Sequence, residues 1–270
     1  MRSSAHLKRL RRIAPSLWLA LLLTACTSHP QRQTSRHDRN PPHTTWQGAR
    51  VSQDGAVLKL EYEGYTLWLD CERRAAVRFA YRAVKDSGRL PRGHRFRLDP
   101  AVPAACQQTS TRPYPAGYDR GHQVPANHLD HSATAIRQSH YMTNILPQTA
   151  ELNRGAWQMS EMIIECYRDL GELQVTGGPL WYGKTLDAPL LTTHQVRVPS
   201  AYWKLIVRDN GEAIAWVMPN DAEAVAAALE DYRVPVAQIE RLIGATLPVS
   251  DVARRSVARS WPLPPGCDRG

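Results

Sequence analysis

The sequence predicts an α+β fold, because strand-like and helix-like segments are mixed without the regular alternation of a parallel βαβ fold. Residues 153–170 carry apolar side chains at helical spacing, whereas residues 58–70 alternate apolar and polar side chains as a strand does. Residues 46–270 contain no second linker or internal repeat. They are numerous enough to form one large domain with its own core.

The N-terminal residues 1–25 are expected to be a lipoprotein signal peptide that takes no part in this domain. Five basic residues precede an apolar stretch over 13–25, which is shorter than the roughly 20 residues of a membrane-spanning helix. The stretch ends in Leu-Thr-Ala-Cys, which resembles a bacterial lipobox and makes Cys26 the expected site of lipidation. The two following residues are not acidic, which favours the outer membrane. An ordinary signal peptide cleaved nearby is the alternative.

Residues 26–45 are expected to be a lipidated cysteine followed by a flexible linker. They are rich in Ser, Thr, Pro, His and Arg and have no apolar period. The formal net charge of +9 includes the five basic residues of the signal peptide, so +4 remains for the mature chain. This weakly basic balance is compatible with a polyanionic substrate but does not identify one.

The cysteine count fits an oxidising compartment. Of five cysteines, lipidation of Cys26 leaves Cys71, Cys106, Cys166 and Cys267. Four cysteines outside the cytoplasm favour two disulfides, with three pairings open. Their spacings are too wide for a sulfur-bound zinc site.

Within the domain, the elements follow in chain order. Residues 58–70 should form one or two strands, and 75–84 is β-like although its alanines also suit a helix. Residues 90–113 read as a basic loop, and 126–141 as a loop with a short helix.

The best predicted helix spans residues 153–170 and should stop at Gly171. Its spacing forms one apolar stripe of Ala156, Met159, Ile163, Cys166, Tyr167 and Leu170. Strands are expected at 173–176, 195–198, 202–208 and 213–218, and a helix at 236–242. Trp157 is expected in the core, and Arg137, Lys184, Lys204 and Arg208 as scattered surface charges rather than a nucleic-acid groove.

Chemistry-bearing residues are concentrated between 119 and 161. The run Asp119-Arg120-Gly121-His122 is followed by Thr-Asn-Ile-Leu-Pro-Gln over 143–148, Asn-Arg-Gly-Ala-Trp over 153–157, and then Glu161. Histidine, with an ordinary pKa of about 6.5, is largely neutral near pH 7 and suits a general base. Carboxamides, a carboxylate and an arginine are suitable for binding a divalent ion and a phosphate. Any of these residues alone would more often be a turn, a cap or a surface charge.

In order and spacing, this set resembles the DNA/RNA non-specific endonuclease family, and Ala-Asn-His over 126–128 is similar to endonuclease G. The resemblance covers roughly residues 56–250 and is most specific over 119–161. It implies a central antiparallel sheet flanked by helices, with a ββα-metal (His-Me finger) active site. It also implies metal-dependent hydrolysis of DNA, and of RNA, with little sequence preference and with 5′-phosphate products.

The resemblance also implies roles for individual residues. His122 matches the general base, Asn153 the sole direct protein ligand of Mg²⁺ (with Mn²⁺ as an alternative), and Asn144 an asparagine near the base. Glu161 matches a carboxylate that reaches the water shell of the metal, and Arg120 an arginine with a structural or phosphate-binding role. A further arginine that stabilises the transition state is expected between 92 and 97, with Arg95 as the choice.

Other interpretations remain open at this point. The same fold could serve a catalytically silent nucleic-acid-binding or envelope-structural lipoprotein, or a phosphodiesterase for smaller substrates. His122, His128, His131 and His140 could instead bind zinc, but no tight pair lies on a clear helix. Expected partners are DNA and RNA as substrates and a membrane through Cys26. A protein inhibitor would suit a nuclease that its host must survive during synthesis, although no residue identifies one.

Overall fold

The computed structural model describes residues 44–46, 49–54, 57–182 and 188–267, with side chains from residue 57 onward. The predicted signal peptide, Cys26 and most of the predicted linker lie outside these residues. The first described strand begins at Thr44, inside the segment expected to be linker. No helix in the described part of the chain has the length and apolar character that crossing a membrane requires.

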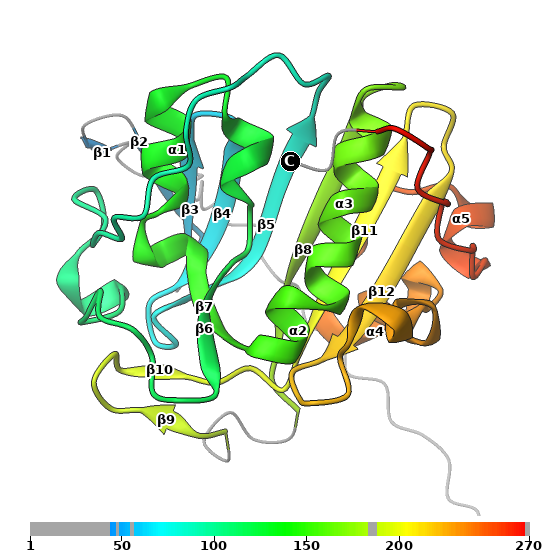
Figure 1. Ribbon diagram of the computed structural model, residues 1–270. Helices are drawn as coiled ribbons and strands as arrows, with labels where there is room; N and C mark the ends of the chain where they lie inside the picture. Colours follow the sequence, from blue (N-terminus) through cyan, green and yellow to red (C-terminus); the bar gives the residue numbers. More distant parts are fainter. Residues whose placement is uncertain (1–43, 47–48, 55–56, 183–187, 268–270) are drawn as a thin grey trace, which may run out of the picture. The chain divides into compact units, whose positions relative to one another are not determined.

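A large antiparallel sheet organises the described residues (Figure 1). Its strand order is β1-β2-β3-β4-β5-β8-β11-β12, and every neighbouring pair is antiparallel. The strands are β1 (Thr44–Trp46), β2 (Ala49–Asp54), β3 (Val57–Tyr62), β4 (Tyr65–Asp70), β5 (Ala75–Ala83), β8 (Leu173–Leu180), β11 (Ala201–Arg208) and β12 (Ala213–Pro219). The predicted α+β class with a central antiparallel sheet is therefore confirmed.

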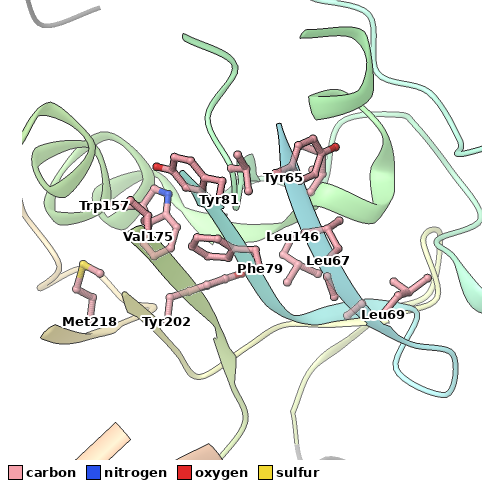
Figure 2. Packing of buried hydrophobic residues seen from close by; sticks show 14 of the residues in the cluster. Tyr65, Leu67, Leu69, Phe79, Tyr81, Leu146, Trp157, Val175, Tyr202 and Met218 are labelled. Carbon is pink, nitrogen blue, oxygen red and sulfur yellow. The ribbon is translucent and has the colours of Figure 1, made fainter. Parts of the chain in front are cut away.

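The two faces of the sheet carry separate apolar clusters. Successive strand residues point to opposite faces, so Tyr202 and Ile206 of β11 join the larger cluster whereas Trp203 and Leu205 join the smaller one. Figure 2 shows the larger cluster, in which Phe79 and Trp157 pack edge to face with ring centroids 6.3 Å apart. The larger cluster lies beneath the helices that carry the candidate site.

Helices cover both faces. On the face of the larger cluster lie α1 (Ala133–Ser139), α2 (Ala150–Arg154) and α3 (Ala156–Arg168), and α3 packs on β5 and β8 (Figure 1). On the other face, α4 (Val236–Ile243) packs on β12 and contacts α5 (Asp251–Arg255). Short 3₁₀ helices are η1 (Ala104–Cys106), η2 (Ala126–Leu129), η3 (Met142–Asn144) and η5 (Ala226–Tyr232).

Two small hairpins stand apart from the large sheet. One pairs β9 (Leu190–Leu191) with β10 (Val196–Arg197). The other pairs β6 (Tyr118–His122) with β7 (Ile145–Thr149) and leads directly into α2 and α3. The second hairpin with its following helices forms a ββα unit, and its two strands were not anticipated as elements from the sequence pattern.

The prediction of one continuous helix over 153–170 is wrong. The helical segment is interrupted at Gly155, whose φ of −113° and ψ of −108° are not helical. A Cβ at Gly155 would lie 2.1 Å from the carbonyl oxygen of Glu151 and 2.7 Å from that of Ala224. Glycine therefore allows the chain to bend closely here, and Asn153 belongs to α2 instead of starting the long helix. Leu170 lies beyond α3 and is 64% exposed, so it is not part of the apolar stripe.

Both predicted disulfides are present, and the structure selects one of the three open pairings. Cys71 pairs with Cys106, which ties the end of β4 to η1. Cys166 pairs with Cys267, which joins α3 to the C-terminal segment across 101 positions of sequence.

Candidate functional site

The ββα unit brings together residues that the sequence analysis singled out. His122 ends β6 and pairs with Ile145 at the start of β7, while Asp119 pairs with Gln148 near its end. Helix α2 begins immediately after β7, at the end of the hairpin where Asp119 lies. Asn153 of α2 is therefore close to Asp119. The hairpin therefore holds a histidine at one end and a carboxamide at the other.

His122 is a buried, neutral imidazole. Its side chain is packed against Phe96 and His140, with ring centroids 5.6 Å and 4.8 Å away, and the residue is 7% exposed. Burial is the main cause that holds the pKa of His122 well below its usual value, and the charges of Arg92, His140 and Arg120 act in the same direction. A histidine held neutral in this way can accept a proton near pH 7.

The two ring nitrogens of His122 have different surroundings. Nδ1 faces Nη2 of Arg92 at 3.5 Å, whereas Nε2 is buried with no hydrogen-bond partner among the described residues. Trp157 donates from Nε1 to the carbonyl oxygen of His122 at 3.1 Å, which fixes the backbone. Trp157 is 1% exposed, as expected of a core residue, and its contact links α3 to the histidine.

Asn144 is a positioning residue rather than a group that faces the histidine ring. It is fully buried, and its Nδ2 donates to the carbonyl oxygens of Val124 and Ser139, both at 2.9 Å. Its Oδ1 accepts from the amide of Val124 at 3.0 Å, and its own carbonyl accepts from Gln123. The carboxamide thus ties the chain just after His122 to the end of α1.

Arg120 contacts the protein backbone and an aromatic ring. Its Nη1 donates to the carbonyl oxygen of Thr111 at 2.8 Å. Its guanidinium lies 3.9 Å over the ring of Phe96, the same ring that packs against His122. Arg120 therefore contacts His122 indirectly, through the ring of Phe96.

Asn153 is held by one carboxylate and keeps one oxygen free. Its Nδ2 donates to Oδ2 of Asp119 at 3.0 Å, and nothing donates to its Oδ1 within the described chain. Asp119 also accepts two hydrogen bonds from Arg154, at 2.8 Å and 2.7 Å. The Arg154 guanidinium, followed by Asn153, lowers the pKa of Asp119 against the opposing effect of burial. A fixed carboxamide oxygen of this kind suits a hard divalent cation such as Mg²⁺.

Glu161 lies on α3 with an unmet acceptor. Its Oε1 is buried and has no hydrogen-bond partner among the described residues. The nearest cation is Nζ of Lys204, at 4.0 Å.

The expectation that Lys204 is a surface charge is wrong, because its side chain is buried. It is 1% exposed on β11, donates to Oγ of Ser160 at 2.8 Å, and lies 3.6 Å over the ring of Trp157. Burial lowers the pKa of Lys204 to about 8, although Glu161 acts in the opposite direction. The available signal was its position in the otherwise apolar run Trp-Lys-Leu-Ile over 203–206.

A pocket of about 790 Å³ opens beside this site. Arg92 and Glu161 line it, together with the carboxamides of Asn127 and Gln158. Arg95, the arginine chosen from the sequence, instead lines a separate pocket of about 320 Å³. Within the expected window of 92–97, the arginine that the structure places against His122 is therefore Arg92.

The histidines proposed as an alternative zinc site have other contacts. Among the described residues, no group of three or more His, Cys, Asp or Glu side chains is arranged to hold a metal ion. His128 contacts the Tyr81 hydroxyl at 2.8 Å and the Glu165 carboxylate at 2.9 Å. His140 bonds through Nδ1 with the carbonyl of Ile136 at 2.9 Å.

Comparison with known proteins identifies what this chain is similar to. The model of the DNA/RNA non-specific endonuclease family matches residues 44–254. Mitochondrial nuclease EXOG of Mus musculus is 27% identical over 80% of this chain and 64% of its own length. Mitochondrial endonuclease G of Bos taurus is 27% identical over 76% of this chain and 74% of its own length. The chain spans about half to two thirds of the length of the EXOG relatives it matches.

A solved structure supports the same architecture. The crystal structure of the EndoG/EndoGI complex, described as showing the mechanism of EndoG inhibition, matches with a TM-score of 0.60 and 23% identity. The match covers 70% of this chain and 84% of the other.

Proposed function

The chain belongs to the DNA/RNA non-specific endonuclease family, and from that premise we propose that it hydrolyses phosphodiester bonds of DNA and of RNA. The observation that carries the proposal is the buried, neutral His122 beside Arg92, on the same hairpin that presents the free oxygen of Asn153.

His122 acts as the general base in this proposal. Its Nδ1 lies on the side of Arg92, and once the Arg92 guanidinium turns to the phosphate, the freed Nδ1 lone pair would take a proton from the water that attacks phosphorus. Arg92 meets the phosphate, since its guanidinium lines the open pocket and lies next to the base. Asn144, Arg120 and Trp157 hold the imidazole and its backbone in place without touching the substrate.

Asn153 would bind the divalent ion through Oδ1, and Glu161 would face the water shell of that ion. We propose Mg²⁺, with Mn²⁺ as an alternative, because a carboxamide and a carboxylate oxygen fit a hard cation that retains several waters. When bound, such an ion neutralises charge at the phosphate and stabilises the leaving oxygen. A single neutral ligand gives little affinity alone, so we expect the activity to be sensitive to chelators.

Low sequence preference follows from the groups available. The pocket lining mixes three cations, Arg92, Lys85 and Arg89, with five carboxylates, and in this proposal the cations contact the phosphates. Contacts to phosphates fix a nucleic acid in position without reading its bases.

The proposed location is the bacterial cell envelope, as a lipoprotein of the outer membrane anchored through Cys26. The lipobox-like Leu-Thr-Ala-Cys over 23–26 and the two disulfides support export to an oxidising compartment. We also propose that a protein inhibitor binds this chain, because the structurally similar EndoG was solved in a complex with EndoGI that concerns EndoG inhibition.

Cleavage of supercoiled plasmid by the mature chain tests the proposed function. The protein is incubated with plasmid in Mg²⁺ or Mn²⁺, and separately in EDTA. The His122→Ala variant is assayed in the same way after circular dichroism has shown that it is folded. We expect metal-dependent nicking that EDTA stops and that the variant slows by about 100- to 10,000-fold. A variant with full activity would exclude His122 as the base. Plasmid binding without cleavage would favour the silent lipoprotein, and cleavage of dinucleotide-like esters alone would favour a phosphodiesterase.

A further inference from the structure

A second pocket lies on the sheet face opposite the candidate active site. It has a volume of about 380 Å³ and is lined by residues of β3, β4, β5, β8, β11 and α4 and of adjoining loops. Leu67 and Phe79 point into the larger cluster on the active-site face, so their neighbours Trp68 and Arg78 point to this other face. Nothing in the proposed cleavage reaction uses this pocket.

The side chains lining the pocket offer hydrogen-bond donors and no acceptors. Its polar side chains are three tryptophans and two arginines, namely Trp68, Trp181, Trp203, Arg73 and Arg78. The remaining lining side chains are aliphatic. An indole can only donate, and a guanidinium donates without accepting. A ligand that satisfies this lining must therefore bring acceptors of its own.

Two of these donors are buried without a partner. Trp203 is fully buried, and its Nε1 has no acceptor among the described residues. Nε1 of Trp181 is in the same situation. Buried polar groups in folded proteins are nearly always hydrogen-bonded, so two donors that the described protein leaves unmet beside one pocket favour an acceptor from a water or a ligand.

Arg78 supplies a positive charge without a carboxylate. Its guanidinium lies 4.8 Å over the ring of Trp68, and its Nε donates to Oγ1 of Thr176 at 3.3 Å. No ion pair within the described chain includes Arg78, whereas the neighbouring Arg73 pairs with Asp70. Partial burial lowers the pKa of Arg78, which is the effect of desolvation on a cation that nothing neutralises.

We propose that this pocket is a second binding site, for a small anion with an aromatic body. A phosphate or carboxylate would accept from Arg78 and from the indole N–H groups, and an aromatic ring would pack among the tryptophans and Ile243. The pocket volume lies in the range of small-molecule sites. The site would function independently of cleavage, so the proposal does not rest on the nuclease activity.

Calorimetric titration of the mature protein in EDTA tests the site. The probes are thymidine 5′-monophosphate for the phosphate head and phenylacetate for the carboxylate head, with uncharged thymidine as the matched neutral compound. We expect saturable binding of at least one anion and none of thymidine. Binding of only one anion identifies the preferred head group. If neither anion saturates, or if thymidine binds equally well, the proposal is wrong.

Variants separate this pocket from the active site. Arg78→Met should weaken binding about tenfold or more, as expected for loss of a charge-assisted hydrogen bond. Arg82→Met, on the same strand and paired with Glu172 away from the pocket, should leave binding unchanged. If Arg78→Met does not fold, Arg78→Lys should weaken binding while keeping the charge. Loss of binding in Arg92→Met but not in the Arg78 variants would place the anion in the active site and overturn the proposal.

Discussion

The two ends of the β6–β7 hairpin are built differently. At the His122 end, the buried His140 ring packs against the imidazole, and the fully buried Asn144 uses its whole carboxamide to hold the backbone. At the Asn153 end, one partly exposed carboxylate, Asp119, holds the side chain and leaves its oxygen free. This difference fits the proposed roles, in which a general base needs a fixed orientation and a metal ligand needs an unused lone pair. Substitutions at the His122 end should therefore mainly lower stability, and substitutions at the Asn153 end should mainly lower activity.

The largest effect should be the loss of stability in Asn144→Ala. Three buried backbone groups of Val124 and Ser139 would lose their partner, and each unmet group costs about 1–3 kcal/mol. We expect the free energy of unfolding to fall by about 3 kcal/mol or more, measured by urea denaturation. A loss below about 1 kcal/mol would show that Asn144 is not a clamp.

Asn153→Ala should damage activity and spare stability. Removing the free Oδ1 should lower metal-dependent cleavage about 100-fold or more, given that even supporting contacts around metal ligands contribute 10- to 100-fold. The free energy of unfolding should change by only about 0.5 kcal/mol, because the side chain is partly exposed. Plasmid cleavage and urea denaturation of the same preparation check both. Equal damage to stability and activity would remove the contrast between the two ends.

Asp119→Asn should have an intermediate effect that appears in the metal requirement. The substitution weakens the acceptor that fixes Nδ2 of Asn153, so Oδ1 is less well oriented. We expect about tenfold more metal to be needed for half-maximal cleavage. Arg154→Met is the control, because it removes the other partner of Asp119 and leaves the Asn153 contact intact. An unchanged metal requirement in Asp119→Asn would contradict the orienting role.

The smallest expected effect is the shift of the pH profile in Arg92→Met, which accompanies the loss of rate from the missing phosphate contact. His122 must be neutral to act as base, and its lowered pKa places the acid limb of kcat/KM below about pH 6.5. Removing the Arg92 charge raises the pKa of His122, so the acid limb should move to higher pH. Arg92→Lys keeps the charge and should keep the limb in place. An acid limb that moves to lower pH in Arg92→Met would contradict this electrostatic effect.

The sequence predicts the fold class and the residues of this site better than the secondary structure that holds those residues. The α+β class, the antiparallel sheet and the four cysteines that pair could be predicted because alternation, motif order and cysteine parity are local or countable properties. The placement of His122 and Asn153 in one unit followed from the family resemblance. The β6–β7 hairpin carries a glycine and a proline, so its sequence has no strand-like alternation and its pairing depends on contacts distant in sequence.

Three details depended on tertiary structure. Gly155 interrupts a stretch with helical periodicity because neighbouring backbone approaches too closely for a Cβ. Arg92 and Arg95 lie in one basic loop, and only the path of that loop decides which reaches His122. Lys204 is buried because Trp157 and Ser160 of α3 cover it, a contact that no local pattern reveals.

The Cys166–Cys267 bond makes the lifetime of the folded protein depend on its redox surroundings. It closes a loop of 101 positions that begins on α3, the helix that also carries Trp157 and Glu161. In the chain-entropy model, a loop of that length contributes about 4.7 kcal/mol, a large share of the roughly 5–15 kcal/mol that stabilises a typical domain. Thiol reductants would therefore shorten the survival of the whole ββα unit, and an oxidising medium preserves it.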